Sequence, residues 1–204
     1  MQTIVRSSGA APEPTQRWFG YAAAQVKLES PQFTAADIHR FLDEFREHER
    51  ELLARRLEDV GRRLQELAPR LLTLDAGGAD LAEDGAWNAR EVVAHLALVS
   101  KLYGVLAYRV ATGKDTSYDL LGIVRLRDVA GEDAARQPVA AHLEAIAADH
   151  ERSLRFLRTA SLEDLERAAD TGVEGLKMSA VDVLRLPLVG HLELHLEQLE
   201  KAVG

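Results

Sequence analysis

Apolar residues recur every three or four positions in four long stretches of this sequence, and this spacing most constrains the fold. Such a repeat places the apolar side chains on one face of an α-helix, whereas a half-buried strand needs strict alternation, which persists nowhere for more than a few residues. Four helices with one apolar stripe each bury those stripes most simply in a four-helix bundle. The sequence therefore predicts an all-α protein.

Capping residues place the first two helices. Thr34, with Asp37 three residues later, is expected to open a long first helix that ends near Pro69. Asn88 is expected to cap a second helix that stops at Gly113. Both helices carry an apolar stripe along most of their length.

The last two helices have equally clear starts. Pro138 suits the first turn of a third helix. Ser179 and Asp182 resemble a capping box that opens a fourth helix, expected to run to about Ala202.

The connections between these helices are uneven in length. Residues 114–137 form a connector that is too long for two antiparallel neighbours, so it suits a crossover between two parallel helices. A shorter connector covers residues 161–177. Short helical turns are expected within them, at 120–124 and 162–169.

Residues 1–33 differ from the rest, and we interpret them as an N-terminal arm before a bundle at 34–204. A Ser/Ala/Pro-rich stretch precedes Trp18, Phe19 and Tyr21. Three aromatic residues so close together favour an arm that docks on the bundle or on a partner subunit. A partly ordered tail with a short helix near 16–28 explains the same pattern, and the sequence leaves both readings open.

The overall composition excludes several classes of protein. A formal net charge of −8 argues against nucleic-acid binding. The absence of cysteine excludes disulfides, thiolate nucleophiles and cysteine-ligated metals. No apolar run approaches the roughly 18 residues of a membrane span, and the first thirty residues hold no signal-peptide core. We therefore expect a cytoplasmic protein that does not bind membranes.

Two of the seven histidines, His191 and His195, are spaced i, i+4 in the fourth helix. This spacing puts both imidazoles on one helix face, close enough to share a metal ion. At 100° per residue they fall on the apolar face, opposite the glutamates of the same helix. That apolar face is expected to comprise Leu184, Leu188, Leu192, Leu199 and Ala202.

His95 occupies the centre of the apolar stripe of the second helix. It lies about as far from the start of that helix as His195 lies from the end of the fourth, so antiparallel packing would bring both to one depth, about 10 Å from one end of the bundle. His95, His191 and His195 are then candidate ligands of one divalent metal ion, with coordination positions left for water or substrate. Core histidines satisfied by a carboxylate or a backbone carbonyl are the alternative.

Other candidates are weaker. Glu91, one turn before His95, is a candidate base or outer partner of the site, although it also suits the first turn of a helix as a favourable charge. His48 lies at the edge of the first stripe, and His150 at a boundary position of the third. His39 is expected to be exposed.

Two segments resemble a known family. The stretch from Trp87 to Leu96, WNAREVVAHL, resembles the "W-[ST]-x-x-E-x-x-x-H-L" segment of the DinB-like (DinB/YfiT) superfamily. The stretch from His191 to Gln198, HLELHLEQ, is similar to the closing "H-x-x-x-H-x-x-Q" helix of that superfamily. The likeness covers about residues 36–203 and is specific in these two segments.

This resemblance implies an up-down-down-up four-helix bundle with a divalent metal, nickel or zinc, held by His95, His191 and His195. It further implies a thiol-dependent transferase or a hydrolase that acts on a small-molecule substrate, with a low-molecular-weight thiol as a partner, and a homodimer. The arm at 1–33 departs from the family pattern. A non-catalytic bundle with a structural or vestigial metal site, acting through assembly, is the alternative function.

Overall fold

The computed structural model describes residues 34–75, 87–125 and 136–203, so the predicted arm at 1–33 lies outside the described residues. The chain divides into two compact units, Met1–Glu47 and His48–Gly204. The boundary falls within helix α2 (Ala35–Leu71). In the first unit, the Thr34 amide donates to the Asp37 carboxylate at 2.9 Å and the Asp37 amide donates back to the Thr34 hydroxyl. The predicted start of this helix is confirmed.

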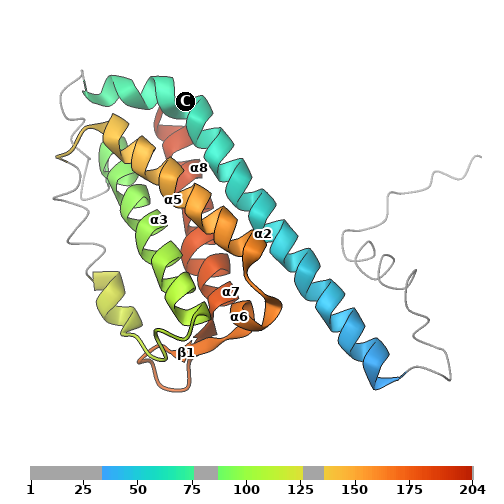
Figure 1. The fold of residues 1–204 in the computed structure, drawn as a ribbon. Coiled ribbons are helices and arrows are strands. Elements are labelled where there is room, and N and C mark those ends of the chain that lie inside the picture. Colours follow the sequence, from blue (N-terminus) through green and yellow to red (C-terminus); the bar gives the residue numbers. More distant parts are fainter. Residues whose placement is uncertain (1–33, 76–86, 126–135, 204) are drawn as a thin grey trace, which may run out of the picture. The chain divides into compact units, whose positions relative to one another are not determined.

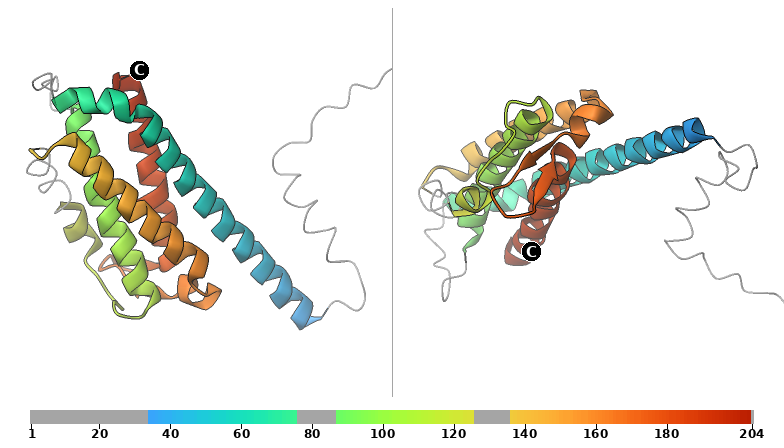
Figure 2. Two further views of the ribbon diagram at one scale, coloured as in Figure 1. Left: turned by 45° about the horizontal axis from the view of Figure 1, so that its top comes forward. Right: turned by 90° about the horizontal axis from the view of Figure 1, so that it is seen from below.

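The second unit is the helical bundle, and its fold is all-α as predicted. It contains the His48–Leu71 part of α2, then α3 (Ala89–Ala111), α5 (Val139–Thr159) and a C-terminal run of helix that ends in α8 (His191–Val203). Helices α3 and α5 run in the same direction, and α8 and this part of α2 run in the opposite one (Figures 1 and 2). This order is the up-down-down-up arrangement, and the α3–α5 connection is the predicted parallel crossover.

Local signals set most helix ends. Helix α3 starts at a complete capping box of Asn88 and Glu91, and ends at Ala111 before Gly113, whose φ of 68° suits a residue without a side chain. Helix α2 passes Pro69, its expected end, and stops at Leu71, where a 3-10 turn (η1, Leu72–Asp75) follows.

The segment between α5 and the C-terminal helices holds a feature that the sequence analysis missed. Helix α6 (Leu162–Glu166) is shorter than expected, and an antiparallel hairpin of β1 (Ala168–Asp170) and β2 (Lys177–Ser179) follows it. Each strand has three residues, so alternation is too short to be recognised. The expected turn within 114–137 is confirmed, because residues 120–125 are helical.

The C-terminal helix is continuous but not uniform. The predicted capping box of Ser179 and Asp182 opens α7 (Ala180–Val183). A π-helical segment, η3 (Leu184–Gly190), follows and leads directly into α8. Pro187 lies inside this segment and has no amide hydrogen, so it cannot donate the usual i→i−4 bond. Because a π-helix has more residues per turn than an α-helix, this segment changes the directions in which the side chains of the following helix point, beginning at His191.

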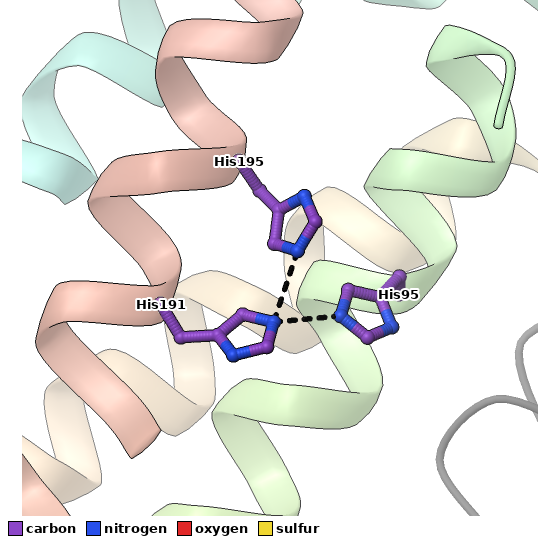
Figure 3. Close-up of side chains that lie close together, drawn as sticks. All are labelled: His95, His191 and His195. Atoms are coloured by element: carbon purple, nitrogen blue, oxygen red, sulfur yellow. Dashed lines mark hydrogen bonds between the residues drawn. The ribbon is translucent and has the colours of Figure 1, made fainter. Parts of the chain in front are cut away.

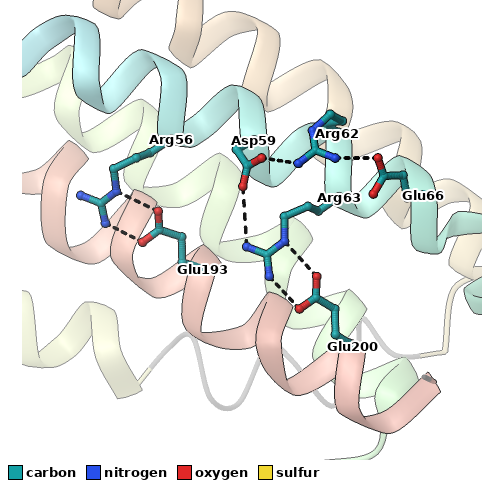
Figure 4. A network of polar contacts seen from close by, with 7 residues as sticks. All are labelled: Arg56, Asp59, Arg62, Arg63, Glu66, Glu193 and Glu200. Atoms are coloured by element: carbon teal, nitrogen blue, oxygen red, sulfur yellow. Dashed lines mark hydrogen bonds and ion pairs between the residues drawn. The ribbon is translucent and has the colours of Figure 1, made fainter. Parts of the chain in front are cut away.

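Two arginine–glutamate pairs join α2 to α8 (Figure 4). Arg56 binds Glu193, and seven residues further on Arg63 binds Glu200 through nitrogen–oxygen contacts of 2.9 and 2.7 Å. Both pairs join residues 137 positions apart, so the two helices run parallel and in register. These contacts raise the pKa of Arg56 and of Arg63 and lower the pKa of Glu200.

Helix α3 lies at the centre of the bundle. Twelve of its residues between Val92 and Ala111 are buried, and most of the apolar ones among them join one cluster with α2, α5 and α8. Although α3 contains no uninterrupted apolar run as long as a membrane span, it is long and apolar enough to cross a membrane by length and composition alone. However, 61% of that stretch is buried inside the bundle, as in the core helix of a soluble protein.

Candidate metal centre

Three imidazoles from two helices converge on one point (Figure 3). The Nε2 atom of His191 lies 2.9 Å from Nε2 of His95 and 2.9 Å from Nε2 of His195. One nitrogen from each residue lies within 4.8 Å of the others, which makes this trio a group able to hold a metal ion. The structure therefore brings together the three histidines that the sequence analysis selected.

The helix positions explain the convergence. His95 lies two turns inside α3 and is 1% exposed, whereas His191 and His195 are half-buried on α8. Helices α3 and α8 run in opposite directions (Figure 1), and His95 on α3 lies beside His191 and His195 on α8. The predicted apolar face of the fourth helix was only partly right, because Leu196, which was not included, is buried and Ala202, which was included, is exposed.

Proton counting shows that the trio suits a cation better than it suits mutual hydrogen bonds. A neutral imidazole nitrogen carries either one hydrogen or one lone pair. Nε2 of His191 therefore cannot form two good hydrogen bonds, to His95 and to His195, at the same time. A cation bound by three lone pairs would remove this conflict.

The tautomer of His195 is fixed from outside the trio. Its Nδ1 lies 3.0 Å from Oε1 of Gln198, and an amide oxygen can only accept, so the Nδ1 hydrogen points to Gln198. The lone pair of His195 is then on Nε2, the atom that faces the other two histidines. Holding a ligand in its metal-binding tautomer is a common task of such outer residues. The sequence analysis gave Gln198 no role, although its i+3 spacing from His195 was visible.

The nitrogen–nitrogen distances within the trio would fit a small divalent ion if the three rings moved slightly apart. Two nitrogens bound at about 2.0–2.1 Å with a tetrahedral angle are roughly 3.3 Å apart. The contacts of 2.9 Å around His191 are a few tenths of an ångström shorter. Imidazole donors suit zinc, nickel, copper and iron, and three protein ligands leave positions for other molecules.

Two aromatic side chains border the trio. The Trp87 ring lies 4.4 Å from His95 and, at an interplanar angle of 21°, 6.0 Å from His195, measured between ring centroids. The Tyr103 ring lies 6.5 Å from His191. These rings exclude water from parts of the site and restrict how the imidazoles can turn.

Glu91 has a structural role in the described contacts. Its carboxylate accepts a 2.8 Å hydrogen bond from the Asn88 amide, and its own amide donates to the Asn88 side chain. These bonds complete the capping box of α3, in line with the structural alternative considered above. Its assignment as a base stays a prediction.

The remaining histidines do not join the trio in the part of the chain that the structure describes. His39 is exposed, as expected, and His48 is exposed rather than directed at the metal centre. The boundary position given to His150 was wrong, because this residue is 4% exposed and its Nε2 lies 3.1 Å from the Ser100 hydroxyl. Burial lowers the pKa of His150 to about 4.

An all-α bundle with a three-histidine cluster between its second and last main helices defines the class of this protein. The sequence profile of the DinB superfamily matches residues 56–199, so the chain belongs to that superfamily. No curated protein and no solved structure gave a match. The family match covers the whole cluster and begins within the second compact unit.

Proposed function

We propose that this protein is a metal-dependent enzyme in which His95, His191 and His195 hold a divalent ion. The observation that carries the proposal is the double contact of His191 Nε2 with the two other ligand nitrogens, both at 2.9 Å. Hydrogen bonds alone satisfy this arrangement poorly, and a shared cation satisfies it well. Nickel or zinc is the proposed ion, because both accept imidazole ligands.

The chain itself supplies binding and orientation. Gln198 holds His195 in the tautomer that presents Nε2, and Trp87 packs against two of the three rings. A bound divalent ion supplies Lewis acidity, which lowers the pKa of a thiol or water so that a nucleophile exists at neutral pH. The proposed reactions are therefore thiol transfer, in which a low-molecular-weight thiol is the second reactant, and hydrolysis, both on a small-molecule substrate. A cytoplasmic homodimer is part of the same proposal.

Metal content tests the ligand set. Full-length protein purified without a histidine tag should contain close to one divalent ion per chain. Replacement of His95, His191 or His195 by Ala should each abolish that content, while the exposed His39→Ala variant should retain it. Unchanged metal content in the three ligand variants would refute the proposal.

Cobalt substitution separates an enzyme from a structural site. Because the chain contains no cysteine, any thiolate-to-cobalt absorption band must come from an added thiol. The enzyme proposal predicts an exchangeable water on the ion and a spectrum that responds to added thiols. The alternative, a non-catalytic bundle that acts through assembly, predicts a closed coordination sphere and no response.

A substrate panel separates the two reactions. Activated esters are incubated with metal-loaded protein, with and without a low-molecular-weight thiol. Ester turnover without thiol indicates hydrolysis, and turnover that requires thiol indicates transfer. Equal rates for the wild type and the His95→Ala variant would show that the cluster does not carry the activity.

A further inference from the structure

A cavity of about 270 Å³ lies between α3 and α5, on a different pair of helices from the metal centre. None of the three clustered histidines lines it. Spaces between the helices of a bundle are a common place for small-molecule sites, and this volume is slightly below the range typical of drug-sized ligands. It therefore suits a molecule smaller than a typical drug.

The surface of this cavity is mostly apolar, but its buried lining residues are polar. Ser100, Asp149 and Ser153 line it and are 1%, 6% and 5% exposed. The Ser100 hydroxyl is bonded to His150, and Asp149 is paired with Arg152. Among the described residues, the Ser153 hydroxyl has no hydrogen-bond partner. Its oxygen is open to the cavity, so this hydroxyl is the group to which a ligand in the cavity would form a hydrogen bond.

Gly104 keeps the Ser153 hydroxyl open. It lies in the interior of α3, where glycine is less favourable than alanine. A Cβ atom at this position would lie 2.7 Å from Oγ of Ser153, which is closer than real Cβ contacts. Both residues line the cavity. The glycine thus preserves space at the hydroxyl at some cost to the helix.

The rim of the cavity is cationic and aromatic. Lys101 and Arg152 are exposed at the rim, and Lys101 has no ion-pair partner among the described residues. Asp149 is already neutralised by Arg152. Tyr108 and Phe156 form a corner, with ring centroids 5.8 Å apart and an interplanar angle of 80°. Lys114 lies over the Tyr108 ring, with its Nζ 5.1 Å from the ring centroid. The site therefore offers uncompensated positive charge next to an apolar wall, although the whole protein has a net charge of −8.

We propose that this cavity is a second ligand site, which binds a small aromatic carboxylate. The ring packs against Tyr108 and Phe156, Lys101 pairs with the carboxylate, and the Ser153 hydroxyl donates a hydrogen bond to it. Each of these groups lines the cavity, and the two polar groups have no other described partner. The site does not depend on the proposed metal chemistry.

The test compares 2-naphthoate with its neutral isostere 2-naphthamide. Full-length protein is freed of metal, so that a carboxylate cannot bind at the histidine cluster, and binding is followed by calorimetry and by amide chemical shifts. Wild-type protein should bind the carboxylate roughly 3- to 10-fold more tightly than the amide, as expected for one partly exposed charge pair. The largest shifts should fall near Gly104 and Ser153.

Three cavity variants and one control variant assign the contacts. Lys101→Met should remove the preference for 2-naphthoate, whereas Lys177→Met, an exposed lysine that does not line the cavity, should keep it. Ser153→Ala should weaken binding roughly 2- to 10-fold. This variant should fold normally, because the hydroxyl has no described partner to lose. Gly104→Ala should also weaken binding, because the added methyl displaces that hydroxyl.

Several results would overturn the proposal. One is equal affinity for the two probes, and another is no binding at millimolar concentration. Shifts centred on the histidine cluster would place the ligand elsewhere. Concentration-dependent shifts of the same residues without any ligand would show that a second copy of the chain covers this face.

Discussion

The indole of Trp87 lies against the imidazole of His95, with ring centroids 4.4 Å apart and an interplanar angle of 56°. The same indole is nearly parallel to the ring of His195. Trp87 therefore contacts ligand candidates from both helices of the cluster, although it precedes the first turn of α3. Its packing links the orientation of the two rings.

Loss of this contact should weaken metal binding. We expect Trp87→Ala to lower nickel or zinc affinity roughly tenfold, because both imidazoles gain rotational freedom that binding must remove. Trp87→Phe keeps an aromatic ring in place and should lose much less. Isothermal titration with each metal measures the difference. Equal affinity in the alanine variant would show that the indole does not orient the ligands.

Gln198 offers a sharper test of tautomer control. Gln198→Leu removes the acceptor 3.0 Å from His195 Nδ1, so the hydrogen on that ring can move to Nε2 and block the metal-binding atom. Metal affinity should fall roughly tenfold, while the free energy of unfolding of the metal-free protein changes little, because Gln198 is exposed. Gln65→Leu, an equally exposed glutamine on α2, is the matched control and should bind metal normally.

Structural features that arise from residues close together in the sequence could be predicted, and features that depend on more distant pairing could not. The helix starts at Asn88 and Ser179 were predictable, because a capping box involves residues three positions apart. The π segment around Pro187 was not, because regular 3.6-residue geometry was assumed on both sides of it. The β1–β2 hairpin was missed because its strands are stabilised by pairing rather than by a recognisable repeat.

In the candidate metal centre, the ligands could be predicted from the sequence but the residues that support them could not. His95, His191 and His195 were found because each lies on an apolar stripe and the motif spacing resembled a known family. Gln198 and Trp87 act through contacts that depend on side-chain orientation, which spacing alone does not give.

The Arg63–Glu200 pair should couple α2 to α8 measurably. Both side chains are partly buried and bind through two nitrogen–oxygen contacts, so a double-mutant cycle of Arg63→Ala and Glu200→Ala should give a coupling energy of about 1 kcal/mol. High salt should reduce it. The Arg155–Glu151 pair, highly exposed on α5, is the control and should give almost none. Similar coupling energies in both pairs would contradict the prediction that partial burial strengthens the Arg63–Glu200 ion pair.

The buried His150 should make the protein less stable in mild acid. Its pKa is lowered from 6.5 to about 4, mainly because burial disfavours the charged ring, although nearby Asp149 partly opposes this. Below pH 6.5 the unfolded chain therefore binds a proton that the folded chain does not, so stability falls with pH until about pH 4. The total loss is roughly 3 kcal/mol, of which about 2 kcal/mol is expected by pH 5.

Urea unfolding of metal-free protein at pH 7 and pH 5 measures this loss. His150→Gln removes the titrating group and retains an amide that can bond to Ser100, so the difference in unfolding free energy between the two pH values should shrink by about 2 kcal/mol. His39→Gln, which changes an exposed histidine, should leave it unaltered. If the wild type and the His150→Gln variant lose the same stability between pH 7 and pH 5, a buried neutral His150 is not the origin of the acid sensitivity.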